Sequence, residues 1–536
     1  MKRPVLLSVA LAVSAMGAPA WAADPIESFQ LPRIGDAAPA AQVNAVFDHV
    51  NFQGNQALST ATLSAIAAPY LGRALGADDL ETLRQKLTRA YVDRGYVNSG
   101  VLRGSATATG TLNFLIIEGR LAEVRLHGME RLHDAYVSAR LQREEDGALN
   151  LDQLRNRFQL LLTDPLFVRM NARLLPAEKP GEAIMDIEVQ RARPWELSAY
   201  VNNYRPVSIG AEQMGLRGLV RNLTGRGDLL EASVQLPFHA GAGKHGSLGW
   251  TLPLGRLTNV SVALEGGSAS VIEEPVKVLD IRSTVVSGEL GLNHTFIETL
   301  SQRLTLGLNW EHRENRTSLL GQPYSFTLGD ATGEIRESLW KFWQDYNWRS
   351  EKQVLSLRST FTFGSNSLQE VAGLPALAGP ARRFQFWTGQ LRYGRQVMDN
   401  GAQLVLRATV QQSRDRLLSL DGLSLGGVSS VRGYRENQLI RDEGLYLNLE
   451  FEYPAIANSA SGMRLTLIPF YDFGRARNRG DESTMLSSCG LAGRAQWRDF
   501  SLDLAIAKRL GHSASVQRAG SNLQDEGIHL QASYSF

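Results

Sequence analysis

The chain has little cysteine and no obvious metal ligands. Cys489 is the single cysteine among 536 residues, and one thiol can form neither an internal disulfide nor a zinc site of the multi-cysteine kind. The nine histidines include no H-E-x-x-H motif and no close pair with a carboxylate at ligand spacing. The sequence therefore predicts no metal site and no cofactor.

An excess of charge and long apolar runs are also missing. The chain has 56 basic and 54 acidic residues, and without Lys2 and Arg3 the two counts are equal. This balance gives no support for nucleic-acid binding. No segment approaches the roughly 18 uninterrupted apolar residues of a spanning helix. A membrane-bound chain of this kind must be a closed barrel, because only helices and closed barrels satisfy their backbone hydrogen bonds in lipid.

The N-terminus has the pattern of a secretory signal. Lys2 and Arg3 precede a mostly apolar stretch over 5–16, and Ala20-Trp21-Ala22 offers a small-x-small cleavage site. We predict a signal peptide at residues 1–22 and a short proline-containing segment at 23–41. The mature protein is then expected beyond the inner membrane.

A doubled pattern fills residues 42–193. Residues 50–54 match 124–128, and residues 80–84 match 151–155. Two similar offsets predict a tandem repeat of about 75 residues. Each unit has the pattern strand, helix, helix, strand, strand, which gives domains at 42–120 and 121–193. In the first unit Ser59 or Thr60 is expected to cap a helix that ends near Pro69.

The segment 167–174 alternates in polarity, as a strand with one solvated face does. Its two predicted faces are Val168, Met170, Ala172 and Leu174, and Arg169, Asn171 and Arg173. An extended partner can add a strand to a free sheet edge through main-chain hydrogen bonds. We take Phe167, Arg169, Asn171 and Arg173 as a candidate binding edge. The alternative, a strand covered by its own neighbours, stays open.

From Pro194 onward the period changes to two. Residues 445–453 alternate apolar with polar, as do 230–236, 304–311 and 528–536. This is typical of a transmembrane barrel with lipid outside and a polar lumen inside. A soluble β-sandwich would also alternate, but the number of segments and the signal sequence favour an all-β barrel over 194–536. About 16 strands can be counted, in line with the even number of strands typical of such barrels.

Two motifs in the barrel region belong together. Strand counting places 413–443 as the sixth outward loop, with Val431-Arg432-Gly433-Tyr434 near its middle. Gly433 allows a tight turn, and the planar Arg432 side chain can bind a carboxylate with two hydrogen bonds. Asp472, in the motif Phe470, Asp472, Gly474, is the candidate partner on an inward strand face. The alternative is a solvated loop arginine and a lumen carboxylate facing water.

Together these features resemble the outer-membrane transporters of two-partner secretion, the TpsB or ShlB–FhaC–HecB family of the Omp85 superfamily. The resemblance implies two α+β POTRA domains in the periplasm, followed by a barrel of 16 antiparallel strands in the bacterial outer membrane. It also implies that loop 413–443 folds into the lumen. There Val431, Arg432, Gly433 and Tyr434 would lie against a wall motif of Phe470, Asp472 and Gly474.

The resemblance further implies a pore that recognises an unfolded exoprotein in the periplasm and passes it to the cell surface without ATP. The implied partners are an exoprotein of haemolysin, adhesin or contact-dependent toxin type, outer-membrane lipid and the barrel assembly machinery, with no nucleic acid. No catalytic residue is expected. Residues 422–426 match the G-x-S-x-G elbow pattern, but they lack its strand-to-helix setting. An insertase of the same superfamily is the main alternative, ahead of an enzyme barrel and a diffusion porin.

Overall fold

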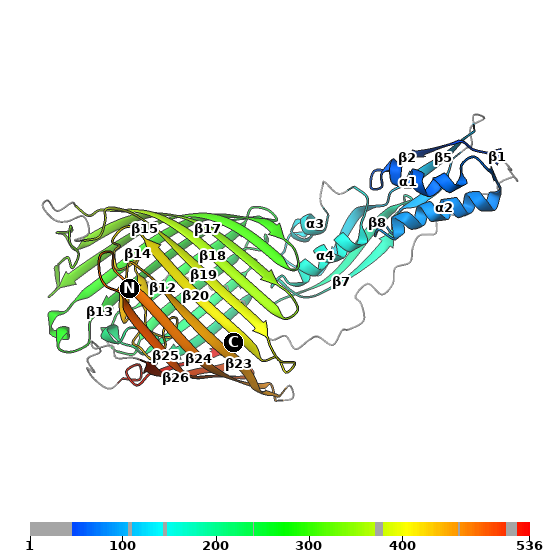
Figure 1. Ribbon diagram of the computed structural model, residues 1–536. Helices are drawn as coiled ribbons and strands as arrows, with labels where there is room; N and C mark the ends of the chain where they lie inside the picture. The colour runs from blue at the N-terminus through cyan, green and yellow to red at the C-terminus, as the bar shows by residue number, and fades with distance from the viewer. Residues whose placement is uncertain are drawn as a thin grey trace. The chain divides into compact units, whose positions relative to one another are not determined.

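A computed structural model describes residues 45–104, 110–142, 147–239, 241–369, 379–458, 461–510 and 522–536. The described chain forms two compact units, one ending at Arg193 and the other running from Pro194 to Phe536. The α-helices belong to the first unit, and long strands build the second (Figure 1). The predicted signal peptide at 1–22 and the segment 23–41 lie outside the described residues.

The first domain is a small sheet covered by helices. Its elements are β1 (Ala45–Val46), β2 (His49–Gln53), α1 (Thr60–Ala67), the 3-10 helix η1 (Ala68–Tyr70), β3 (Ala74–Leu75), α2 (Ala77–Val92), β4 (Gly100–Arg103) and β5 (Thr111–Ile117). The main sheet has the order β2-β5-β4, with β2 parallel to β5. Helix α1 begins after Ser59, whose hydroxyl accepts the N–H of Thr62 at 3.3 Å, as expected of a helix cap.

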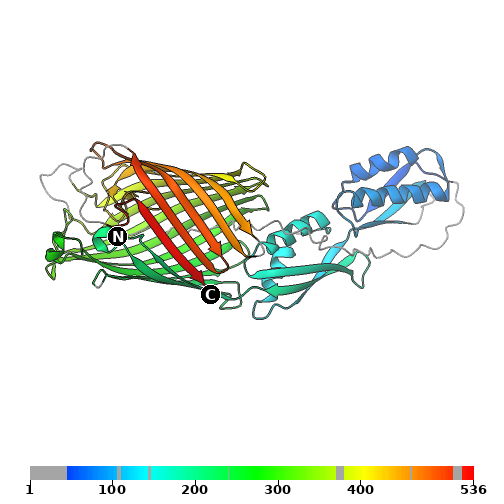
Figure 2. The ribbon, with the colours of Figure 1, turned by 90° about the horizontal axis from the view of Figure 1, so that it is seen from below.

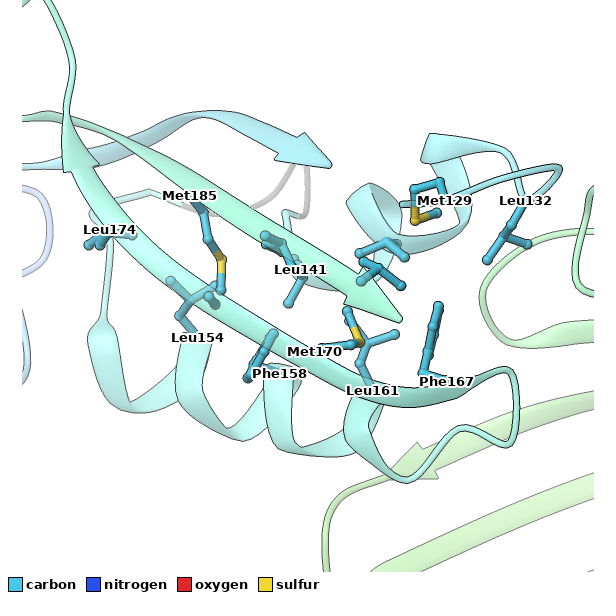
Figure 3. Packing of buried hydrophobic residues seen from close by; sticks show 14 of the residues in the cluster. Met129, Leu132, Leu141, Leu154, Phe158, Leu161, Phe167, Met170, Leu174 and Met185 are labelled. Carbon is cyan, nitrogen blue, oxygen red and sulfur yellow. The ribbon is translucent and has the colours of Figure 1, made fainter. Parts of the chain in front are cut away.

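The second domain repeats this plan. Its elements are β6 (Arg120–His127), α3 (Asp134–Leu141), α4 (Leu151–Leu162), β7 (Phe167–Pro176) and β8 (Glu182–Arg191). The sheet order is β6-β8-β7, so β7 lies at an edge. Leu154, Phe158 and Leu161 of α4 pack against Met170 and Met185 of the strands (Figure 3). No helix in the described ranges is both long and apolar enough to cross a membrane.

A matching glycine ends the first strand of the repeat in each domain. Gly54 has φ +88° and Gly128 has φ +80°. An added Cβ would lie 2.4 Å from the carbonyl oxygen of Ile116 in the first case and 2.2 Å from that of Val189 in the second. Only glycine fits such a position. The two domains therefore share one local architecture, which accounts for the repeat seen in the sequence.

The second unit is a closed barrel (Figure 2). Its spanning strands are β9 (Trp195–Asn202), β10 (Gln213–Arg221), β11 (Leu229–Pro237), β12 (His245–Pro253), β13 (Thr258–Ser270), β14 (Arg282–Glu298), β15 (Gln302–Leu319), β17 (Glu334–Arg349), β18 (Gln353–Asn366), β19 (Arg383–Gln396), β20 (Gln403–Ser413), β23 (Glu443–Asn458), β24 (Met463–Arg477), β25 (Thr484–Trp497), β26 (Phe500–Leu510) and β27 (Ile528–Ser535). These are 16 antiparallel strands, which confirms the predicted number. The two-residue β16 (Gln322–Pro323) extends one hairpin, and the 3-10 helices η2 (Val207–Ile209) and η3 (Val276–Leu279) lie in loops.

The barrel closes between its first and last strands. Residues 531–535 of β27 pair with 198–202 of β9, a ladder of five residues. Next to this ladder, the side-chain amide of Asn203 forms two hydrogen bonds with the backbone of β27. It donates to the carbonyl of Ile528 at 2.9 Å and accepts the N–H of Leu530 at 2.9 Å. The closing seam is therefore completed by a side-chain amide.

Polarity is inverted relative to a soluble protein. On β15 the outward side chain of Leu308 is 45% exposed, whereas Glu311 and Arg313, which point inward, are each 4% exposed. The paired strand β14 exposes Leu292 to 50%. An apolar outer surface around a charged interior is what a lipid-embedded barrel requires, and the closed strand order excludes a two-sheet sandwich.

Candidate functional site

The loop between the eleventh and twelfth strands folds back into the barrel. Loop 6, defined here as residues 414–442, connects β20 to β23, as strand counting predicted. Within it β21 (Leu423–Leu425) pairs with β22 (Leu439–Arg441). At the tip Val431 and Tyr434 are buried and pack with Ala476 of β24 and Leu486 of β25. The tip thus lies against the inner wall.

The guanidinium group of Arg432 donates two hydrogen bonds to the carboxylate of Asp472. Nε donates to Asp472 Oδ2 and Nη2 donates to Oδ1, each at 2.7 Å, and the Arg432 backbone N–H donates to Oδ2 at 3.0 Å. The Arg432 side chain is 5% exposed and that of Asp472 is 0% exposed. The structure therefore brings together the two residues that the sequence paired, in the bidentate geometry that arginine and carboxylate favour.

A second carboxylate shares the arginine. Nη1 of Arg432 lies 2.7 Å from Oε1 of Glu450, which also contacts Arg407. Asn448 donates to Asp472 Oδ1 at 2.7 Å and to the backbone carbonyl of Ser430 in the loop. Sequence reasoning missed Glu450 and Asn448 as site residues. The available signal was their position on the polar, inward side of the alternating segment 445–453, next to the loop.

Small residues and one aromatic ring let the tip approach the wall closely. The guanidinium carbon of Arg432 lies 3.5 Å from the centroid of the Phe470 ring, an arrangement that favours a cation. A Cβ on Gly474 would lie 2.9 Å from Cγ2 of Val431, and a Cβ on Gly433 would lie 2.9 Å from the Cβ of Ala507. Gly433 also has φ +87°. All three residues of the predicted wall motif thus face the loop.

The rest of the tetrad binds the last strands. His529 Nε2 accepts the N–H of Gly433 at 3.1 Å, and Arg509 Nε donates to the carbonyl of Gly433. The hydroxyl of Tyr434 donates to the carbonyl of Ser487 at 3.3 Å, and Arg509 lies over its ring. His529 and Arg509 were not predicted, because alternation assigns residues to a face and not to a partner.

The two residues after the tetrad, Arg435 and Glu436, bind residues of other outward loops. Arg435 binds Asp525 through two hydrogen bonds of 2.7 and 2.8 Å and binds Glu273 at 2.8 Å. The N–H of Glu436 donates to Gln524 Oε1 at 2.9 Å, and Gln524 Nε2 donates to the carbonyls of residues 203 and 205 beside the closing seam. Loop 6 is therefore connected to the loops that precede β14 and β27.

The described residues of this site include one sequence that matches a catalytic motif. Ser424 of the G-x-S-x-G sequence lies on β21 and donates to Asn437 Oδ1 at 2.6 Å, so it is not at a strand-to-helix turn. Across the described ranges no group of three or more metal-binding side chains is placed to hold an ion. The buried ion pairs hold loop 6 in place.

The second candidate site, β7, is an edge strand, but its N-terminal part differs from the prediction. Phe167 is buried and its ring lies against Tyr136, so its side chain is not available to a partner. Val168, predicted on the face of Met170, is 66% exposed. The reason is a register shift between residues 167 and 169, since a β-bulge moves the residues before it to the other face. Arg169 and Arg173 are exposed and Asn171 is partly exposed.

A paired-domain unit, a closed 16-stranded barrel and an arginine-anchored inward loop define an outer-membrane barrel protein of the architecture that the family resemblance implied. The sequence profile described as haemolysin secretion/activation protein ShlB/FhaC/HecB matches residues 181–496, and the ShlB-type POTRA domain profile matches 46–119. The chain belongs to the ShlB/FhaC/HecB family. It is a two-partner secretion transporter of the bacterial outer membrane, with its POTRA domains in the periplasm.

Individual relatives agree with this assignment. The hemolysin transporter protein ShlB of Serratia marcescens is 24% identical over 468 residues, covering 84% of this chain and 79% of that protein. The heme/hemopexin transporter protein HuxB of Haemophilus influenzae is 24% identical over 441 residues, covering 79% and 74%. The structure of CdiB from Escherichia coli matches with a TM-score of 0.70 at 19% identity, covering 94% of this chain and 92% of that one. BamA from Haemophilus ducreyi matches at 0.51 with 13% identity, covering 92% and 100%, which shows the shared fold alone.

Proposed function

We propose that loop 6 blocks the resting pore and that the Arg432–Asp472 pair is the latch that keeps it seated. The observation that carries this proposal is the burial of both side chains inside the barrel, with two 2.7 Å hydrogen bonds between them. A chain passing through the lumen has to displace the loop tip or move past it. The latch therefore sets how readily the pore opens.

We further propose that the client first binds the edge of β7 as an added strand. β7 pairs only with β8 among the described strands, so its other edge can accept main-chain hydrogen bonds. A shallow depression beside it is lined by Leu154 and Phe158 of α4 and by Ala172 and Leu174 of β7. This depression is too small to take up a large side chain, so main-chain hydrogen bonds along β7 are proposed to carry the binding.

Charge reversal on the exposed face of β7 tests this step. The double substitution Arg169→Glu, Arg173→Glu should weaken capture of the unfolded client by the purified transporter, without changing the barrel. Arg125→Glu is the matched control, since Arg125 is an exposed arginine on β6, the opposite edge of the same sheet. Equal loss of capture in both variants, or no loss in the double variant, would argue against the β7 edge.

The client is proposed to be one large exoprotein of the haemolysin, adhesin or contact-dependent toxin type. A relative named as a hemolysin transporter supports this class. Deleting the transporter should remove one large protein from the culture supernatant. Depletion of many outer-membrane barrels would instead support the insertase alternative. We also propose that outer-membrane lipid and the barrel assembly machinery are its assembly partners, and that it catalyses no covalent reaction.

A further inference from the structure

Loop 6 carries further buried charged side chains besides Arg432, and one of them, Asp421, forms an ion pair with the barrel wall. The side chain of Asp421 is 4% exposed, and its Oδ1 lies 3.0 Å from Nη1 of Arg313 on β15. The same nitrogen lies 3.1 Å from Oε2 of Glu337 on β17, and the side chain of Arg313 is itself 5% exposed. Asp421 thus attaches the loop to the seventh strand, whereas Arg432 attaches it to the twelfth and thirteenth.

The barrel wall does not need Asp421 to neutralise its own cations. Arg313 also contacts Glu311 at 3.2 Å. Lys341 contacts Glu311 at 2.5 Å and Glu289 at 3.1 Å. Arg313 and Lys341 therefore already have three wall carboxylates as partners, and Asp421 adds a fourth. Burying a further carboxylate is costly unless it is well paired. The contact thus serves the position of the loop and not the assembly of the wall.

Apolar packing also attaches the base of loop 6 to the barrel wall. Leu417 packs with Leu339 of β17 and Phe384 of β19, and Leu418 packs with Ile335 at the start of β17. Gln411 of β20 donates to the backbone carbonyls of residues 421 and 442, at 2.9 and 3.0 Å. In the closed strand order, β15 and β17 are separated from β23 by β18, β19 and β20. The base of the loop thus contacts strands from β15 to β20, and the tip contacts β23, β24 and the strands that follow them.

We propose that Arg313 is a second anchor of loop 6, which holds the base of the loop through Asp421 while Arg432 holds the tip. The lumen is cleared only when both ion pairs open. Arg313 and Asp421 are positioning residues and need not touch the client. This inference deepens the proposed blocking role of loop 6, but its test uses the transporter alone, so its failure is distinguishable from a failure to secrete.

The test measures how often the base of the loop lifts off the wall. Leu418→Cys is placed in a Cys489→Ala background, because Leu418 is 6% exposed and its replacement is reached only when the base opens. The folded transporter in detergent is treated with a water-soluble maleimide, whose labelling rate follows the open population. Asp421→Asn should raise that rate about tenfold, since it removes the negative charge that strengthens the hydrogen bond with Arg313. It should also raise the mean pore conductance in planar bilayers.

The matched control is Asp503→Asn, which removes a half-exposed ion pair with Arg494 between β25 and β26. Its labelling rate should equal that of the unmodified background. Asp421→Ala is the second variant, and it should behave like Asp421→Asn. An unchanged labelling rate in folded Asp421 variants would overturn the proposal. Failure of both Asp421 variants to form a heat-modifiable barrel would also overturn it, because the wall would then depend on Asp421.

Discussion

Removing the latch arginine is the most direct perturbation of the transporter. Arg432→Ala deletes two hydrogen bonds to Asp472, one ion pair to Glu450 and the contact with the Phe470 ring. Breaking a buried ion pair costs about 3–5 kcal/mol. Asp472 keeps Asn448 as a donor, and Glu450 keeps Arg407, so the lower end of this range applies.

A cost of about 3 kcal/mol lowers the ratio of seated to released loop about a hundredfold. Arg432→Lys keeps the charge but loses the planar fork, so we expect an intermediate effect of about tenfold. Released loop should appear as higher conductance in planar bilayers and as faster protease cleavage within loop 6. Secretion should fall, as measured by the amount of the client in the culture supernatant.

The controls separate the latch from assembly. Each variant must show heat-modifiable mobility on gels, as a folded barrel does. Asp472→Ala should resemble Arg432→Ala, and the double variant should be little worse than either single one, because residues in one ion pair are not additive. A folded Arg432→Ala barrel with unchanged conductance, cleavage and secretion would refute the reasoning.

Three further changes probe the packing of the loop, the POTRA core and the lipid surface. Gly474→Leu should release loop 6 without touching a charge, because its side chain would occupy the space of Val431; conductance checks this. Phe158→Ala should destabilise the POTRA unit by about 3–5 kcal/mol, since Phe158 is 2% exposed, as measured by urea unfolding. Leu308→Arg, on the outer surface of β15, should cost up to about 2–4 kcal/mol in lipid and lower the yield of folded barrel in vesicles, whereas Leu308→Ile should not.

Much of this architecture could be predicted because periodicity is a local signal. The alternation of Leu445 to Tyr453 assigns each residue to the lipid or the lumen, and counting such segments gives 16 strands and the place of loop 6. The pairing of Arg432 with Asp472 followed from the family resemblance. Neither the alternation nor the resemblance identifies a second carboxylate beside Arg432. Alternation therefore placed Glu450 on the inward face, but it did not indicate that Glu450 pairs with Arg432.

Contacts across the lumen and local irregularities could not be predicted. Arg313 and Asp421 are 108 residues apart in the chain. Alternation applies to the strand that carries Arg313, but it says nothing of Asp421, which lies in a loop. The bulge before Arg169 shifts the register by one residue, which a strict period of two cannot represent. This is why Val168 was assigned to the wrong face and the side chain of Phe167 to a free edge.

The short ladder between β27 and β9 makes the closing seam of the barrel easier to open than a long ladder such as that between β14 and β15. Five residue pairs, two flanking main-chain hydrogen bonds and the side-chain amides of Asn202 and Asn203 hold this contact, whereas the one between β14 and β15 runs over sixteen pairs. Spontaneous fraying should concentrate there, so backbone amides of residues 528–535 should exchange with deuterium sooner than those of β14. Since Gln524 links this place to the backbone of loop 6, loosening the loop should hasten that exchange.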